Sequence, residues 1–154
     1  MLDIYLTCDT EVWCNGWNAL DAEFPQAFDR YVYGRGDGGE GVGLPFQVKT
    51  LNEHGLRGVF FVEPLFSGRF GLAPLQEIVG IVRDGGQEVQ LHLHTEWADE
   101  ARPPLLPSVP EKRQHLRYFD LDQQTALIGT GASLLERAGG GRPRAFRAGS
   151  FAFN

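Results

Sequence analysis

Two short segments of the sequence combine histidine and carboxylate side chains at spacings that suit a metal centre. In "HLHTE" the residues His92, His94 and Glu96 are each two apart, and in "CDTE" so are Asp9 and Glu11. Side chains two residues apart on a strand project from one face at about 7 Å, which one ion can bridge. Imidazole and carboxylate ligands suit zinc, and also iron, nickel or cobalt. The pattern therefore predicts a divalent metal centre, with zinc as the first choice.

A purely structural interpretation of these histidines is the alternative. A single buried histidine is more often a hydrogen-bonded core residue than a ligand. Here an H-x-H pair closes one expected strand and a D-x-E pair closes another. Because strand ends carry the active sites of α/β proteins, two such pairs favour the metal. Arg147 closes a further strand in "FRAGSF", where it suits either the partner of a catalytic carboxylate or a surface ion pair.

The elements that must position these residues alternate between strand and helix. Strands are expected at short apolar runs, over 3–8, 57–65, 88–97 and 144–151. Helices are expected where apolar residues recur at helical spacing, over 44–55, 72–86 and 120–140. This order predicts an α/β protein with a parallel sheet or barrel, in a single domain over 1–154. We expect a long loop or insertion over 12–43 and a proline-rich loop over 98–118.

The motifs, in this order, resemble those of the polysaccharide deacetylase family, the NodB-homology domains of carbohydrate esterase family 4. The family's T-F-D-D-G motif corresponds to "TCDTE" at 7–11. Its H-[ST]-x-x-H motif, with the G-H-E-[IV] segment before it, corresponds to "GQEVQLHLHTEW" at 86–97, and its R-P-P-[YF] motif to "RAGSF" at 147–151. The resemblance implies a distorted (β/α)7 barrel. This chain would cover about its first four strands, as the N-terminal part of a longer catalytic domain.

Roles for four residues follow from the resemblance. Asp9 falls on the catalytic base, and His92 falls on the first metal ligand. Arg147 falls on the arginine that orients the base. Ser150 falls on the residue whose backbone N–H helps to form the oxyanion hole. The general acid of the family belongs to an L-H-x-H motif that has no counterpart in this sequence, and we expect it beyond residue 154.

Two positions depart from the family pattern. Thr10 stands where the first motif has its second aspartate. Some divergent members of the family use D-x-D, which would make Glu11 the ligand, and the sequence leaves open whether Thr10 or Glu11 replaces that aspartate. Glu96 stands where the second motif has its second histidine, while an additional histidine is present at position 94. The sequence leaves open whether His94 or Glu96 is the second ligand of this segment.

The activity that the resemblance implies is metal-assisted hydrolysis of an amide in an N-acetylated sugar, within a glycan or its precursor. Two alternatives stay open. One is an allantoinase-like or cyclic-amide hydrolase on the same fold, which would act on a small amide. The other is a domain that binds metal or sugar without catalysis.

Composition excludes some other classes of protein. The formal net charge is -6, which argues against binding to nucleic acid or to anionic membranes. No apolar run approaches the roughly 18 residues of a membrane helix, and the N-terminus lacks the basic stretch of a signal peptide. Two cysteines do not make a disulfide framework. We expect a cytoplasmic enzyme without a nucleic-acid partner; its oligomeric state is not indicated.

Overall fold

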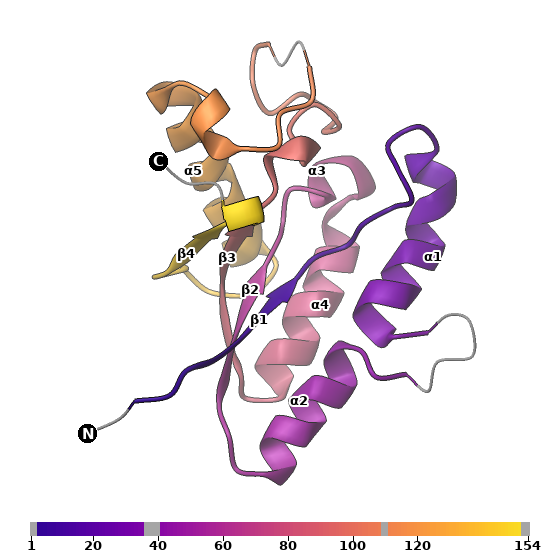
Figure 1. The fold of residues 1–154 in the computed structure, drawn as a ribbon, viewed down its shortest axis with the longest axis vertical. Helices are drawn as coiled ribbons and strands as arrows, with labels where there is room; N and C mark the ends of the chain where they lie inside the picture. The colour runs from indigo at the N-terminus through magenta and orange to yellow at the C-terminus, as the bar shows by residue number, and fades with distance from the viewer. Residues whose placement is uncertain (1–2, 36–40, 109–110, 152–154) are drawn as a thin grey trace.

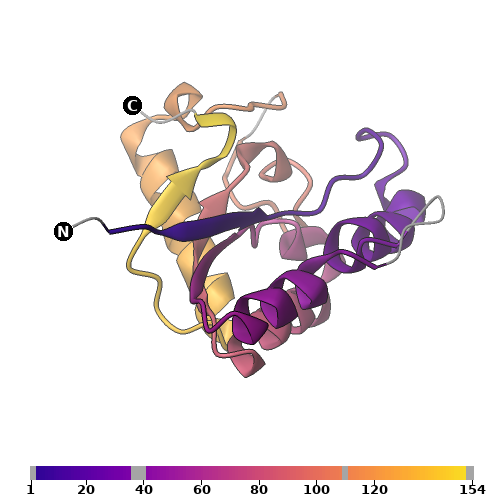
Figure 2. The same cartoon turned by 60° about the horizontal axis from the view of Figure 1, so that its bottom comes forward.

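Four parallel strands form one curled sheet in the computed structural model, which describes residues 3–35, 41–108 and 111–151 (Figures 1 and 2). The strands are β1 (Leu6–Thr10), β2 (Gly58–Val62), β3 (Glu88–Leu93) and β4 (Phe146–Ala148). The helices are α1 (Leu20–Tyr33), α2 (Leu44–Glu53), α3 (Ser67–Phe70), α4 (Leu72–Asp84) and α5 (Leu121–Arg137). Single 3₁₀ turns occupy Thr95–Trp97, Leu116–Tyr118 and Gly149–Phe151.

The strands lie in the order of the sequence, β1-β2-β3-β4, and each pairs in parallel with the next. Parallel neighbours need a crossover, which helices provide between the strands. All four strands therefore end at the same edge of the sheet. This α/β half-barrel is compatible with the predicted architecture, and it brings the ends of β1, β3 and β4 to one place.

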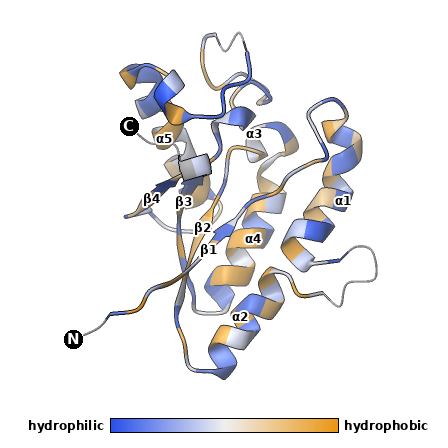
Figure 3. Ribbon diagram, viewed as in Figure 1, coloured by the Kyte–Doolittle hydropathy of each residue, from blue (hydrophilic) through white to orange (hydrophobic). Residues whose placement is uncertain are grey.

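The hydrophobic core lies between one face of the sheet and the helices. Phe60 and Val62 of β2, with Leu91 and Leu93 of β3, are almost completely buried in it. Figure 3 shows hydrophobic residues concentrated in β2 and along α4, in the middle of the molecule. Each such side chain contributes about 1.5–3 kcal/mol when it leaves water. Because side chains alternate along a strand, His92, between Leu91 and Leu93, faces the opposite side of the sheet.

The start of α5 shows how local chemistry fixes a helix boundary. The side chain of Asp120 accepts a hydrogen bond from the backbone N–H of Gln123, and the Gln123 side chain accepts one from the backbone N–H of Asp120. This reciprocal capping satisfies two of the N–H groups that a helix start leaves unpaired. The expected start at residue 120 is confirmed.

The prediction of a loop throughout 12–43 is wrong, because α1 occupies Leu20–Tyr33. Pro25 stands inside this helix and removes one backbone donor, which disfavours the prediction of a helix from the sequence. The helix forms because Leu20, Phe24 and Ala27 lie on one face and are buried in the core. Tertiary packing thus outweighs the local effect of the proline. The short helix α3 was also not predicted.

In the parts of the chain that the structure describes, none of the helices combines the length and the apolar character that crossing a membrane requires.

Candidate metal centre

The strands β1, β3 and β4 end beside the turn at Gly149–Phe151 (Figure 1). Acidic and histidine side chains gather at this edge of the sheet. Asp9 lies in β1 and Glu11 directly follows it, while Thr10 between them is buried on the opposite face. His92 lies in β3 and His94 directly follows. The alternation of side chains along each strand therefore turns two acids and two histidines to the same side of the sheet.

Three of these side chains form a cluster with the donor atoms of a metal site. One ligand atom each from Glu11, His92 and His94 lies within 4.8 Å of the others. Oε2 of Glu11 is 2.6 Å from Nε2 of His94 and 3.8 Å from Nε2 of His92. Both histidines are nearly buried, at 3% and 7% exposure. Of the four predicted ligands, the structure brings three together.

The strand pairing sets the orientation of His92. In the register of β3 and β4, His92 lies opposite Arg147, and its Nδ1 is 2.9 Å from the carbonyl oxygen of Arg147. A carbonyl can only accept, so Nδ1 carries the hydrogen and Nε2 keeps its lone pair. Such a backbone contact is how metal-binding histidines are usually held in one tautomer. His92 is therefore prepared to bind an ion through Nε2.

Glu96 lies outside the three-residue cluster. Its Oε2 is 3.4 Å from Nδ1 of His94, the ring nitrogen that does not approach Glu11. The chain leaves the strand at His94 and turns through Thr95–Trp97, so Glu96 no longer continues the alternation. Between the two possible second ligands of this segment, the geometry supports His94. Glu96 lies on the far side of the His94 ring from Glu11, which is where carboxylates commonly orient metal-binding imidazoles.

One unsatisfied polar atom supports the fit to a metal ion. Among the described residues, Oε2 of Glu11, which faces both histidines, is buried without a partner in hydrogen-bonding geometry. Buried polar groups normally have such partners. The contacts between these side chains are close but not aligned as hydrogen bonds. Two imidazoles and one carboxylate that converge in this way suit a cation such as zinc, and they equally suit other borderline divalent metals.

The pKa values of the clustered side chains are shifted by burial and by their mutual contacts. Burial, the largest single cause, would raise the pKa of Glu11, but the contacts with His94, Trp13 and His92 together lower it below its usual value. Burial opposes charge on His94 as well, yet its contacts with Glu11 and Glu96 raise its pKa to about 10. Burial lowers the pKa of His92, which favours the neutral form that binds metals.

A carboxylate held by an arginine adjoins the cluster. Nη1 of Arg147 donates to Oδ1 of Asp9 at 2.5 Å, and its Nη2 donates to Oγ1 of Thr7 at 3.0 Å. The guanidinium also lies over the ring of Phe61, 4.1 Å from its centroid. Two donated bonds and an aromatic face leave this arginine little freedom. The structure contains an ion pair between Arg147 and Asp9, and its catalytic role stays a prediction.

Ser150 completes the surroundings of the cluster. A cavity of about 270 Å³ is lined by Asp9, Glu11, Arg147 and Ser150, together with both histidines and Ala148. The backbone of Ser150 is left-handed, with φ 54° and ψ 24°, a conformation that costs energy outside glycine. Its hydroxyl accepts a hydrogen bond from Nε2 of Gln114 at 2.9 Å. The oxyanion role of its backbone N–H stays a prediction.

Some residues of this region were not found from the sequence. Trp13 packs edge-on against His94, with ring centroids 4.7 Å apart. Glu63 is fully buried just after β2, and burial raises its pKa to about 8 against the hydrogen bonds that it accepts from the N–H groups of Leu65 and Phe66. No sequence motif identifies either residue. The position of Glu63 directly after a buried strand could have identified it as a candidate site residue.

Gly149 is predicted to be required for the position of His94. An added Cβ would lie 2.6 Å from the carbonyl oxygen of Leu93 and 2.8 Å from Nδ1 of His94. Because the first of these atoms belongs to the backbone, Gly149→Ala should lower the free energy of unfolding by about 1–3 kcal/mol. It should also weaken zinc binding. Urea denaturation and a zinc titration measure the two effects.

The matched control for Gly149→Ala is Gly129→Ala. Gly129 lies in α5, where an added Cβ has no atom within 4 Å. Alanine there should raise stability by up to about 1 kcal/mol, because it favours the helix. Equal stability of Gly149→Ala and the unchanged chain would show that the turn moves freely away from His94.

Comparison of the chain with family models, with curated proteins and with solved structures gave no match.

Proposed function

We propose that the chain provides the metal centre and the base of a hydrolase that removes N-acetyl groups from an amino-sugar glycan or its precursor. The observation that carries this proposal is the shared cavity. It joins a Glu11–His92–His94 cluster to an Asp9 carboxylate that Arg147 holds in place. The motif resemblance supplies the substrate class.

The cluster has the composition of a catalytic rather than a structural metal site. Structural zinc sites use four protein ligands, whereas catalytic sites use three and keep a position open. Here three protein donors converge, and the cavity lies beside them. A divalent ion bound by Glu11, His92 and His94 would polarise an amide carbonyl and lower the pKa of water.

In this proposal, each residue around the cavity has its own role. Asp9 accepts a proton from the attacking water, as a general base. Arg147 keeps the Asp9 carboxylate in one orientation through Nη1. The backbone N–H of Ser150 donates to the oxygen that gains negative charge. His92 and His94 stay fixed by the Arg147 carbonyl and by Glu96.

Acetate release tests the proposal. The chain is loaded with zinc and incubated with oligomers of N-acetylglucosamine. Because the L-H-x-H general acid has no counterpart in this sequence, it is also incubated with 4-nitrophenyl acetate, whose leaving group needs no proton, and free acetate is measured in both cases. We expect release that disappears when the metal is removed and returns when zinc is added. Hydrolysis of allantoin or hydantoin without acetate release would support the cyclic-amide alternative. Stoichiometric zinc with no hydrolysis of any of these compounds would contradict catalysis by this chain.

A further inference from the structure

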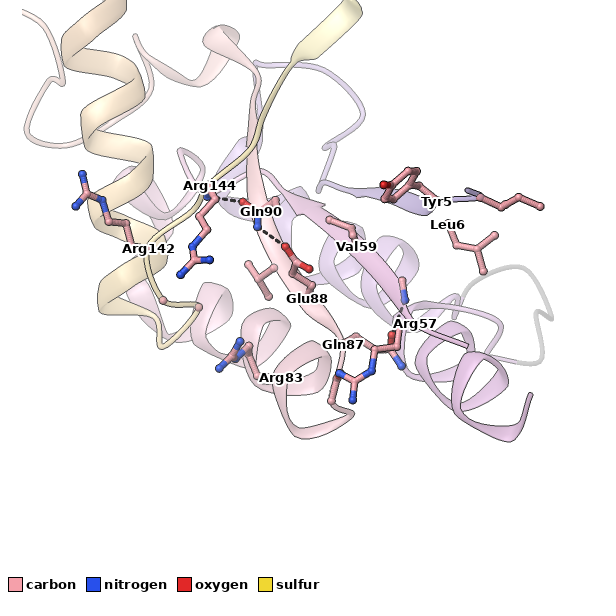
Figure 4. Close-up of a pocket in the computed structure, with 16 residues that line it drawn as sticks. Tyr5, Leu6, Arg57, Val59, Arg83, Gln87, Glu88, Gln90, Arg142 and Arg144 are labelled. Carbon is pink, nitrogen blue, oxygen red and sulfur yellow. Dashed lines mark hydrogen bonds between the residues drawn. The ribbon is translucent and has the colours of Figure 1, made fainter. Parts of the chain in front are cut away.

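A second and larger cavity lies at the opposite end of the sheet, where the strands begin (Figure 4). Its volume is about 760 Å³. Its walls include the first residues of three strands, Leu6 of β1, Gly58 of β2 and Glu88 of β3. The metal-centre residues line a different cavity. The proposed hydrolysis does not use this second cavity.

Four arginines surround this cavity, although the chain as a whole is acidic. Arg57 comes from the turn before β2, Arg83 from the end of α4, and Arg142 and Arg144 from the segment before β4. In Figure 4, Arg83 and Arg144 lie on one side of the hollow and Arg57 on the other. Three segments that are far apart in the sequence therefore contribute arginines to the walls of this cavity.

The charges of these guanidinium groups are not paired with carboxylates within the described part of the chain. Among the described residues, none of the four arginines takes part in an ion pair, and Arg57 donates one hydrogen bond to the carbonyl oxygen of Gly86 at 3.0 Å. The acidic residue in the wall, Glu88, accepts from Nε2 of Gln90 at 2.5 Å. The Glu88 carboxylate therefore offsets one of the four arginine charges, and the walls of the cavity keep an excess of positive charge.

Two buried glutamines hold the arginine-bearing segments in place. Oε1 of Gln90 accepts from the backbone N–H groups of Arg144 and Ala145, both at 2.7 Å. Oε1 of Gln87 accepts from the backbone N–H of Gly58 at 2.7 Å, next to Arg57. Both glutamine side chains are at most 5% exposed. The backbone that carries Arg57 and Arg144 is therefore fixed before any ligand arrives, which lowers the entropy cost of binding.

We propose that this cavity binds the diphosphate group of an organic phosphate ester. Guanidinium groups form paired hydrogen bonds with phosphate oxygens, and several of them can share two adjacent phosphates. A cavity of this size leaves room beyond the anion. Ile4 and Tyr5, at 76% and 79% exposure, stand in its wall and offer an apolar and an aromatic surface to the organic part.

Calorimetric titration with inorganic pyrophosphate tests the proposal without requiring knowledge of the whole ligand. The chain is stripped of metal, desalted, and compared with His92→Ala, so that the metal centre cannot account for binding. We expect saturable binding at about millimolar concentration or below in both proteins, weakening as salt rises. Absence of saturable heat in both would overturn the proposal.

Paired substitutions locate the binding. Arg83→Gln with Arg144→Gln should weaken pyrophosphate binding by about a hundredfold, roughly tenfold for each lost guanidinium. The control pair, Arg30→Gln with Arg117→Gln, makes the same change of charge at exposed arginines outside the walls of this cavity. It should leave the affinity within about twofold. Equal weakening by both pairs would contradict a site and indicate attraction to overall charge.

Discussion

Replacing His92 by alanine should remove most of the metal from the purified protein. His92 supplies one of three donor atoms, and its Nδ1 contact with the Arg147 carbonyl leaves Nε2 free for an ion. Loss of an outer-shell partner alone typically costs 10- to 100-fold in metal affinity, so loss of a ligand should cost more than about a hundredfold. Elemental analysis of protein purified without chelator, followed by zinc titration, measures the change.

The control for this experiment is His54→Ala. His54 is exposed at the end of α2, and it is not part of the cluster. Its removal should leave the zinc content near that of the unchanged chain. If His92→Ala and His54→Ala both keep stoichiometric zinc, the proposed metal centre is wrong. His92 and His94 would then be buried polar residues with a structural role only.

Asp9→Asn should lower the rate of acetate release by about 10²–10⁴-fold, which is the usual contribution of a general base. The amide has nearly the same shape as the carboxylate but cannot take up the proton. Because Asp9 is not one of the three clustered donors, the zinc content should not change. Turnover and metal content, measured on the same preparation, separate this role from that of a ligand. An unaltered turnover number would place the base elsewhere.

Arg147→Lys gives a graded comparison. Lysine keeps the charge beside Asp9 but cannot bond Asp9 and Thr7 at once through two nitrogens, as Arg147 does. We expect a smaller loss of turnover than in Asp9→Asn. The contact that holds His92 comes from the backbone carbonyl of Arg147, so zinc binding should survive the substitution. Full turnover in Arg147→Lys would mean that the orientation of Asp9 does not depend on the guanidinium fork.

Alternation along strands is what made much of the site predictable. His92 and His94 share a face because they are two residues apart in or next to β3, and the same holds for Asp9 and Glu11 at β1. Glu96 follows the same spacing in the sequence, but the 3₁₀ turn at Thr95–Trp97 breaks the alternation. Sequence spacing does not show where a strand stops, and that is why the choice of the second ligand had to await the structure.

The pairing of Asp9 with Arg147 depends on a property that the sequence does not display. β1 and β4 are the two edges of the sheet, with two strands between them. In a flat sheet these two strands would be separated by three interstrand spacings of nearly 5 Å each, which is too far for their side chains to form a hydrogen bond. Curling of the sheet brings Arg147 onto Asp9. The strands and most helices follow from local patterns, whereas this curvature follows from how they pack together.

The position of Glu11 has a consequence for local opening of the protein. Glu11 follows the edge strand β1, whereas His92 and His94 belong to β3 or directly follow it, with β2 between. An edge strand has a paired neighbour on one side only and tends to open before the centre of a sheet. An ion shared by these residues would tie the edge to an inner strand. Amide hydrogens of β1 should then exchange with deuterium more slowly when zinc is present, while those of α5 change little.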